Sequence, residues 1–510
     1  MDNKVLIEIG IKNLPYNLYD VVIRNLKEEL NKNLEINNID YNEVKFNYSK
    51  NRILFSFIIA NTIDVNNNKI SKIIIDSLNK LFIPIKDLEI SYFLKDYIIW
   101  IQGMKDDIFL DFTDFNISNE VDSNITFYKM VSINEYIDLL RENNIILEND
   151  VRRNYFITKA NKLAKEYGGV LFDSNYLIEK YINSYNLPYP ILKNFDNKLL
   201  EYPQKLLVAI LLDICNVFPV VNEKNTLLPY FIFSVEKHDI DDENKISNIH
   251  LDKINVLLEV LKKYEKTMEF SYEYYLDKMK NTKLPMEIGT VYDETLRIKS
   301  FAKILGSYLK VGENTINNIE QEADICKLDL ATDIVKEMPA LKGIIGYLYA
   351  KENGFNDIVS NAMYMYYRPR FFYDKMPDTT SAKILSIADK LDSIANVFIY
   401  NTLNMKDNLY QTTDIRRKAS GVINIIIDNK WDLNLSVIIN DLIYTYIKYN
   451  NIVVDYEVLK NEIKSFILSK YREELINKNF QYKSIDNLIK KYPDNISKIH
   501  EILTKGEEDE

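Results

Sequence analysis

The chain has 510 residues, too many for one hydrophobic core, so we expect several domains. Hydrophobic residues make up 47% and charged residues 27%, a balance typical of globular proteins, while a net charge of −11 argues against broad, non-specific binding of nucleic acid. Two well-separated cysteines, Cys215 and Cys326, exclude a disulfide framework. Because no apolar run is long enough for a membrane span and no signal peptide is visible, the sequence predicts a cytoplasmic protein without membrane contact.

The first hundred residues alternate strands and helices. Strands are predicted by short apolar or alternating runs at residues 5–9, 44–48, 52–59, 90–94 and 97–101. The runs 44–48 and 52–59 predict one hairpin, and 90–94 with 97–101 predict a second. Helices are predicted after Pro15, where apolar residues repeat every four positions, and near residues 70–81. This order of elements is an α+β pattern.

The rest of the chain becomes more helical toward its end. Ser132 with Glu135 forms a capping-box signature for a helix, and Gly168 stops the next helix, which is predicted over 151–167. From residue 251 on, glycines are sparse and apolar residues keep helical spacing. We therefore predict an α+β fold with mixed N-terminal domains followed by a mainly helical part. The predicted domains are residues 1–105 (α+β), 106–250 (second α+β), 251–450 (helical) and 451–510 (helical linker region).

The residues that could carry chemistry are scattered. The three histidines, His238, His250 and His500, lack the spacing of a zinc site. The pair His238-Asp239 resembles a phosphohydrolase metal motif, but it stands in an acidic turn, which favours coincidence. No glycine-rich phosphate loop and no Gly-x-Ser-x-Gly elbow occurs in the sequence. The sequence therefore predicts no catalytic residue, no metal site and no cofactor in this chain.

Two basic segments are the better candidates for function. Residues 364–373 interleave Arg368 and Arg370 with aromatic side chains, and residues 416–418 begin with Arg416 and Arg417. Arginine can bind phosphate in a bidentate manner, and aromatic rings can stack on bases. These four arginines are therefore candidate RNA-binding residues. A packed aromatic helix end and an ordinary solvated helix face are the alternative interpretations.

Several short motifs follow one another in a characteristic order. Residues 8–15 are EIGIKNLP, close to Glu-Ile-Gly-Thr-Glu-Glu-Leu-Pro, and residues 49–53 keep one arginine, Arg52, of a Thr-Pro-Arg-Arg-Leu hairpin. Further similar segments are residues 201–204, 218–221, 227–233, 289–293, 326–330, 341–346, 367–371, 388–392 and 415–422. Collinear over most of the chain, they resemble the beta subunit of the two-subunit bacterial glycyl-tRNA synthetase.

The chain also departs from that family's pattern. Glu352-Asn353 stands where the family has His-Asp in its helical HD-type domain, so the resemblance implies a degenerate HD domain without its metal centre. Residues 213–217 lack a His and a Lys, residues 411–413 replace Asp-Pro-Phe, and the stretch at 106–124 is short. Residues 482–502 resemble the helices before the family's C-terminal anticodon-binding domain, which we expect this chain to lack.

The resemblance implies a function within protein biosynthesis. In the family, the beta subunit binds tRNA, while a separate alpha subunit binds glycine, ATP and Mg²⁺ and forms the ester. The resemblance thus implies that the chain is a non-catalytic, tRNA-binding beta subunit of glycine–tRNA ligase, an aminoacyl-tRNA synthetase. It also implies a cytoplasmic α2β2 heterotetramer, in which ATP binding belongs to the complex. The alternative is a degenerate paralogue that acts as an RNA-binding or protein-interaction module. An active phosphohydrolase would need ligands that the sequence does not hold.

Overall fold

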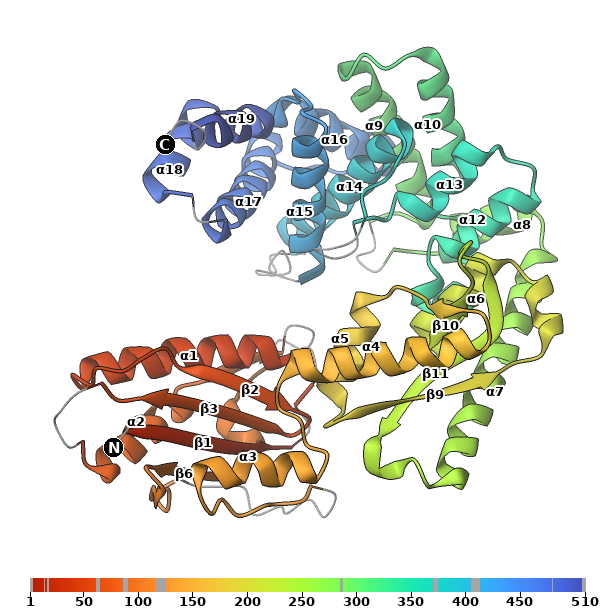
Figure 1. Cartoon of the computed structure of the whole chain (residues 1–510). Helices are drawn as coiled ribbons and strands as arrows, with labels where there is room; N and C mark the ends of the chain where they lie inside the picture. The colour runs from red at the N-terminus through yellow and green to blue at the C-terminus, as the bar shows by residue number, and fades with distance from the viewer. Residues whose placement is uncertain are drawn as a thin grey trace. The chain divides into compact units, whose positions relative to one another are not determined.

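The structure is a computed structural model, and it describes residues 3–12, 14–15, 18–60, 65–85, 90–115, 125–284, 288–369, 375–404, 413–478 and 480–506 (Figure 1). The chain divides into two compact units, of which the first ends at Leu257 and the second begins at Leu258. All the named β-strands belong to the first unit, and the named elements of the second are helices and 3-10 turns. The predicted α+β class is therefore confirmed.

The first unit opens with a five-stranded antiparallel sheet in the order β2-β3-β1-β6-β7. Its strands are β1 (Lys4–Ile11), β2 (Lys45–Ser49), β3 (Arg52–Ile58), β6 (Ile98–Lys105) and β7 (Ile108–Phe109). Alternate residues of β1 face opposite sides. Val5 and Ile7 pack toward α1 (Tyr19–Ile36) and α2 (Asn67–Asn79), whereas Leu6 packs toward α3 (Ile133–Glu142). The sheet thus lies between two helical layers.

The second predicted hairpin is wrong in its pairing. The strand β5 (Ile90–Phe93) pairs with β4 (Phe82–Ile85), and β6 pairs with β1 instead of with β5. A 3-10 turn, η2 (Leu94–Tyr97), separates β5 from β6, and its Leu94 is fully buried. Because β6 gains a long antiparallel register along β1, central sheet pairing outweighs pairing with the neighbour in sequence.

A second, four-stranded antiparallel sheet follows in the same unit, in the order β8-β10-β11-β9. Its strands are β8 (Val170–Leu171), β9 (Pro188–Asn194), β10 (Phe218–Val221) and β11 (Leu227–Glu236). The helices α4 (Asn149–Glu166) and α5 (Asn175–Ser184) pack on it through an apolar core that includes Phe156 and Ala160. Arg152 of α4 is fully buried and donates hydrogen bonds to the carbonyl oxygens of Tyr48 (2.8 Å) and Ile182 (3.1 Å), which joins α4 to both β2 and α5.

Shorter elements complete the first unit, and one long helix leads out of it. They are η3 (Asn197–Glu201), α6 (Gln204–Ala209), η4 (Ile210–Ile214), η5 (Lys237–Asp239) and α7 (Glu243–Met268). Two predicted helix ends are confirmed. Ser132 accepts a hydrogen bond from the Glu135 amide (3.2 Å) at the start of α3, and Gly168 after α4 has a φ of +73°.

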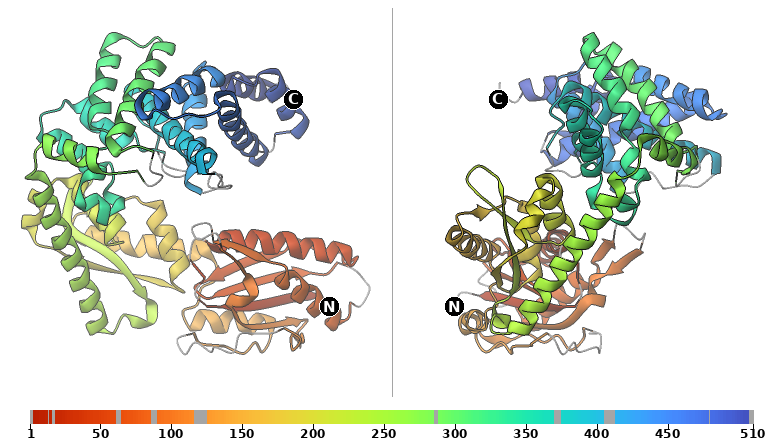
Figure 2. Two further views of the ribbon diagram at one scale, coloured as in Figure 1. Left: turned by 180° about the vertical axis from the view of Figure 1, so that it is seen from behind. Right: turned by 90° about the vertical axis from the view of Figure 1, so that its right-hand side faces the viewer.

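The second unit is an all-helical body, coloured green to blue in Figure 2. Its helices are α8 (Tyr272–Asn281), α9 (Val291–Tyr308), α10 (Glu313–Ile325), α11 (Asp333–Glu337), α12 (Ile344–Glu352), α13 (Asp357–Met365), α14 (Thr380–Asn404), α15 (Thr413–Asp428), α16 (Leu435–Asn450), α17 (Tyr456–Asn477), α18 (Tyr482–Lys491) and α19 (Ile496–Gly506), with the 3-10 turns η6 (Leu328–Ala331) and η7 (Pro339–Leu341). The apolar core gathers around α14, which packs against α9, α10 and α15. Among the described residues, no helix combines the length and the apolar content needed to cross a bilayer.

Candidate functional site

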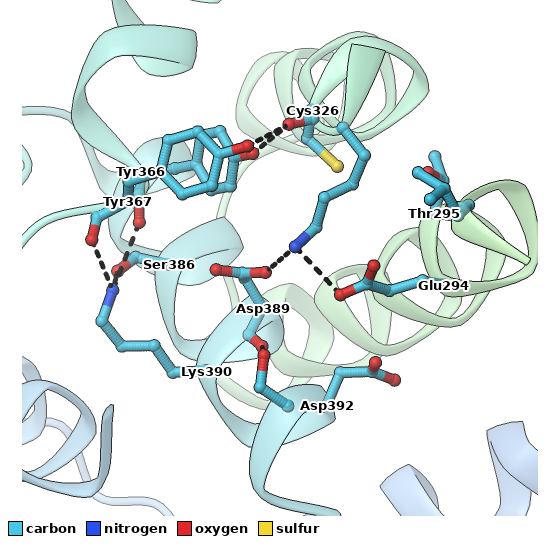
Figure 3. Close-up of polar contacts among 12 residues, drawn as sticks. Glu294, Thr295, Cys326, Tyr366, Tyr367, Ser386, Asp389, Lys390 and Asp392 are labelled. Atoms are coloured by element: carbon cyan, nitrogen blue, oxygen red, sulfur yellow. Dashed lines mark hydrogen bonds and ion pairs between the residues drawn. The ribbon is translucent and has the colours of Figure 1, made fainter. Parts of the chain in front are cut away.

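A group of charged side chains lies in the interior of the second unit (Figure 3). We call it the buried charge cluster, and its members are Glu294 and Arg297 of α9, Lys327 before η6, and Asp389, Lys390 and Asp392 of α14. The ammonium group of Lys327 lies 2.9 Å from Oε1 of Glu294 and forms a short ion pair with the carboxylate of Asp389. Because unpaired charges are costly in a protein interior, this arrangement requires all three side chains together.

The two carboxylates of α14 have different cationic partners. The Arg297 guanidinium binds Asp392 through two parallel hydrogen bonds of 2.8 and 2.9 Å and donates a third to Oδ1 of Asn450 (2.8 Å). It also lies 4.1 Å from the ring centroid of Tyr446, whose hydroxyl donates to the Asp392 carbonyl oxygen (2.7 Å). Residues 294 and 297, like 389 and 392, are three apart and therefore share one helix face. Each helix thus presents two charges to the other.

Lys390 fixes the chain that follows α13. Its ammonium group donates to the three consecutive carbonyl oxygens of residues 366–368, at 2.8 to 3.4 Å, and to Oγ of Ser386 (2.7 Å). Burial lowers the pKa of Lys390 to about 7. A Cβ atom at Gly421 of α15 would lie 2.8 Å from Cε of Lys390, so the glycine leaves room for this side chain where α15 passes it. These contacts hold the backbone that carries Arg368.

Asp329 organises the neighbouring turn. Its carboxylate accepts hydrogen bonds from the Tyr367 hydroxyl (2.9 Å) and from the backbone amide of Gly343 (2.6 Å). Gly343 has a φ of +82°, a left-handed conformation that favours glycine. The ammonium group of Lys342 lies 4.2 Å from the Tyr367 ring centroid, and burial lowers the pKa of Lys342. Tyr367 therefore contacts both Asp329, through its hydroxyl, and Lys342, through its ring.

The predicted RNA-binding arginines have different surroundings. Arg368 is buried, and its guanidinium donates to the Tyr364 hydroxyl (2.7 Å) and lies 4.6 Å from the centroid of that ring. Arg370 lies outside the described residues. Arg416 and Arg417 lie on α15 with about half of each side chain exposed, and they form ion pairs with Glu473 and Asp414 respectively. RNA contact by these residues stays a prediction.

The pair Glu352-Asn353 lies outside the buried charge cluster. It ends α12 with both residues exposed; Glu352 accepts a hydrogen bond from the Tyr264 hydroxyl (2.9 Å), and Asn353 donates to the carbonyl oxygen of Tyr349 (2.9 Å). Within the described ranges, no group of three or more His, Cys, Asp or Glu residues is arranged to hold a metal ion. The carboxylates of the cluster are instead bound by Lys327 and Arg297.

Motifs that are distant in sequence meet in the cluster. The segment 289–293 starts α9, where Thr290 and Asp293 form a reciprocal capping box that sets the position of Glu294 and Arg297. The segments 326–330 and 388–392 supply Lys327, Asp389 and Lys390. Sequence reasoning singled out these segments but missed the individual charged residues. The signal in these segments is charge beside apolar residues, which is equally compatible with a surface position.

The N-terminal motifs meet in a second polar network, in the first unit. Glu8 of β1 is fully buried; its carboxylate binds the Arg52 guanidinium of β3 (2.5 Å) and accepts hydrogen bonds from Trp100 (3.0 Å) and Gln102 (2.6 Å) of β6. A Cβ atom at Gly10 would lie 2.2 Å from the Trp100 indole, so glycine is required for this close approach. The Glu-Ile-Gly motif and the hairpin arginine therefore belong to one structural unit.

Comparison with known proteins identifies a family for most of the chain. The family model described as glycyl-tRNA synthetase beta subunit matches residues 98–490. The chain is 29% identical to the glycine–tRNA ligase beta subunit of Clostridioides difficile, in an alignment that covers 79% of this chain and 58% of the relative. It is 28% identical to that of Halothermothrix orenii, in an alignment that covers 70% of this chain and 50% of the relative. The corresponding protein of Buchnera aphidicola is 31% identical over 61% of this chain and 44% of its own. The chain spans about half the length of the curated relatives it matches.

Proposed function

Because the chain belongs to the glycyl-tRNA synthetase beta subunit family, we propose that it acts as a non-catalytic, tRNA-binding beta subunit of glycine–tRNA ligase. In this role it supports ATP-dependent glycylation of tRNA by a separate alpha subunit, which holds glycine, ATP and Mg²⁺. The single observation that carries the proposal is the match of one family model to residues 98–490. The sequence adds support, since it contains no glycine-rich phosphate loop.

The proposed partner is the alpha subunit, in an α2β2 assembly. Large apolar side chains are exposed on α16, where a protein partner could cover them. They are Val437, Tyr444 and Ile447; Val453 in the following segment and Val458 at the start of α17 are exposed as well. Scattered exposed apolar residues are normal, but several on one helix are typical of protein interfaces. This supports a permanent partner for the second unit.

The proposed tRNA contact involves Arg368, Arg370, Arg416 and Arg417. The buried charge cluster supports it indirectly, because Lys390 holds the backbone of residues 366–368 and Gly421 brings α15 close to that lysine. The interior charges therefore stabilise the arrangement of the two basic segments. Arg416 and Arg417, with half-exposed side chains, are the members best placed to reach a phosphate.

A reconstitution experiment tests the proposal. The full chain is purified with and without the alpha subunit of the same organism, and glycylation of tRNA is measured for the alpha subunit alone, for this chain alone and for the mixture. We expect activity only when both chains are present. If addition of this chain leaves the activity of the alpha subunit unchanged and the two chains do not co-elute, the proposed role is wrong.

The alternative is a degenerate paralogue that acts as an RNA-binding or protein-interaction module, and one observation favours its protein-interaction form. Arg416 and Arg417, both predicted to bind RNA, form ion pairs with acids of their own chain. Such pairs must open before a phosphate can bind, which weakens RNA contact. A host genome that encodes a second, full-length beta subunit would favour this alternative, and the reconstitution assay would then show no activity.

A further inference from the structure

Two lysines of the first unit converge on one tyrosine ring. The ammonium group of Lys159, on α4, lies 4.5 Å from the ring centroid of Tyr189, on β9, and that of Lys237, on η5, lies 4.7 Å from the same centroid. Lys159 also lies 5.0 Å from the ring centroid of Tyr155, one turn earlier on α4. We call these four residues the lysine–tyrosine cluster. All four are partly accessible to solvent.

The two lysines of this cluster contact aromatic rings instead of carboxylates. Neither Lys159 nor Lys237 forms an ion pair with a carboxylate of the residues that the structure describes. Other lysines of the same unit do: Lys27 lies 2.8 Å from a Glu43 oxygen, and Lys80 lies 3.4 Å from a Glu29 oxygen. Like charges that gather in a chain of net charge −11 indicate a site for an anion.

The fold places the cluster on an outer surface by simple geometry. Phe156 and Ala160 of α4 point into the core between the helix and the sheet, so Tyr155 and Lys159, which precede them by one position and are four apart, lie on the adjoining face. Contact with the two rings orients the ammonium groups, because cations are attracted to the face of an aromatic ring. The cluster is therefore pre-organised.

The neighbouring strand edge makes a β-strand partner unfavourable. β9 is an edge strand, and it contains Pro188 and Pro190, which have no backbone N–H to donate to an added strand. Side chains are therefore the better candidates to hold a ligand of this surface. Lysine ammonium and tyrosine hydroxyl groups are both common donors to the phosphate oxygens of nucleic acids.

We propose that the lysine–tyrosine cluster binds the phosphodiester backbone of RNA. This inference rests on the proposed tRNA-binding function and adds a contact surface in the first unit. Each ammonium group donates hydrogen bonds to non-bridging phosphate oxygens, and the rings hold the two lysines in place. The contact is to the backbone, so it adds affinity and orientation without reading the base sequence.

The test compares the full chain with two double variants of equal charge. The first is Lys159→Gln with Lys237→Gln; the control is Lys27→Gln with Lys80→Gln, whose lysines are paired with acids. Binding of the host's tRNA is titrated over a series of salt concentrations. Log affinity falls with log salt, and every phosphate contact that a variant removes makes this slope about one unit less steep. We therefore expect a slope about two units less steep for the first variant and an unchanged slope for the control.

The outcomes separate this inference from the proposed function. Lys159→Arg with Lys237→Arg keeps both charges, and we expect it to bind tRNA as the parent does. If the Gln variant keeps its thermal stability and the parental salt slope, the cluster does not bind RNA. If it loses binding to the alpha subunit but not to tRNA, the surface recognises an acidic protein and our assignment is wrong. A parent chain that binds no tRNA, alone or with the alpha subunit, overturns both proposals.

Discussion

Arg297 and Asp392 are 95 positions apart in the sequence, yet their side chains form two parallel hydrogen bonds of 2.8 and 2.9 Å in the interior of the second unit. Neither side chain exposes more than 1% of its surface. Removing one partner of a buried pair leaves the other charge without compensation, which costs more than the pair itself contributes. The pair therefore makes the packing of α9 against α14 specific.

The first prediction follows from that burial. Asp392→Asn leaves the Arg297 guanidinium buried beside a neutral amide, and we expect a loss of about 3–5 kcal/mol in the free energy of unfolding. Arg297→Met combined with Asp392→Leu removes both charges and should cost less than the single variant. Urea unfolding of the purified chain measures each value.

The matched control is a half-exposed pair of the same chemistry. Arg472 and Asp486 also form two hydrogen bonds, of 2.6 and 3.1 Å, but their side chains are 41% and 45% exposed. We expect Asp486→Asn to cost about 0–1 kcal/mol, because water solvates the remaining charge. Equal losses at the two sites would contradict the explanation by burial.

The second prediction concerns pH. Glu322 of α10 is fully buried; its Oε1 accepts a hydrogen bond from Ser381 (2.6 Å), and its Oε2 has no hydrogen-bond partner among the described residues. Burial raises the pKa of Glu322 from 4.5 to about 8. The folded state therefore holds this proton between pH 4.5 and 8 while the unfolded state has released it. The stability contribution is complete below pH 4.5 and is lost as the pH rises to about 8.

Substitution of Glu322 should remove this pH dependence. We expect Glu322→Gln to flatten the free energy of unfolding between pH 5 and 8 by up to about 1.4 kcal/mol per pH unit. The control is Glu320→Gln on the same helix, because Glu320 forms an ion pair with Lys303, which lowers the pKa of Glu320. That variant should leave the slope in this window unchanged. Denaturant unfolding at four pH values measures both variants. If the free energy of unfolding of Glu322→Gln varied with pH as that of the parent does, the pKa of Glu322 would not be raised by burial.

The third prediction tests the close approach of Trp100 to Gly10. A Cβ atom at residue 10 would lie 2.2 Å from the indole, so Gly10→Ala must displace Trp100 and with it the hydrogen bond to Glu8. Overpacking of this kind costs about 1–3 kcal/mol. Gly312→Ala is the control, because nothing lies within 4 Å of its Cβ position. We expect a lower unfolding midpoint and altered tryptophan fluorescence only for Gly10→Ala; a neutral effect would mean that β6 shifts freely.

The local features of this fold could be predicted because they depend on neighbours in sequence. Ser132 caps α3 as its spacing with Glu135 indicates, and the hairpin of β2 and β3 forms where alternation and a short turn predict it. The pairing of β6 with β1 could not be predicted in this way. It depends on which strand gains the longer register in the folded sheet, and no short motif encodes that choice.

The site was predicted only in part, for the same reason. The segments that contain Lys327 and Asp389 were recognised as motifs, but their ion pair joins positions 62 apart. A lysine in an apolar helix environment is equally compatible with a surface position until its acidic partners are located. Arg368 is a second example: its side chain is buried against Tyr364, which the basic aromatic segment did not indicate by itself, and RNA contact by this residue stays a prediction.

The last prediction concerns the exposed arginines of α15. We expect Arg416→Glu with Arg417→Glu to weaken tRNA binding uniformly across tRNA sequences and to lower the salt slope by about one unit for every phosphate that the variant no longer binds. Reversal at Arg368 is unsuitable as a test, because a carboxylate at this buried position would disturb folding regardless of RNA. The control is Arg141→Glu with Arg153→Glu, which changes the charge equally and removes ion pairs of similar exposure, those of Arg141 with Asp138 and Glu148 and that of Arg153 with Glu179. Thermal unfolding establishes that all variants are folded. If both double variants bind tRNA with the same affinity and slope, Arg416 and Arg417 serve only their ion pairs with Glu473 and Asp414, and RNA contact must lie elsewhere on the chain.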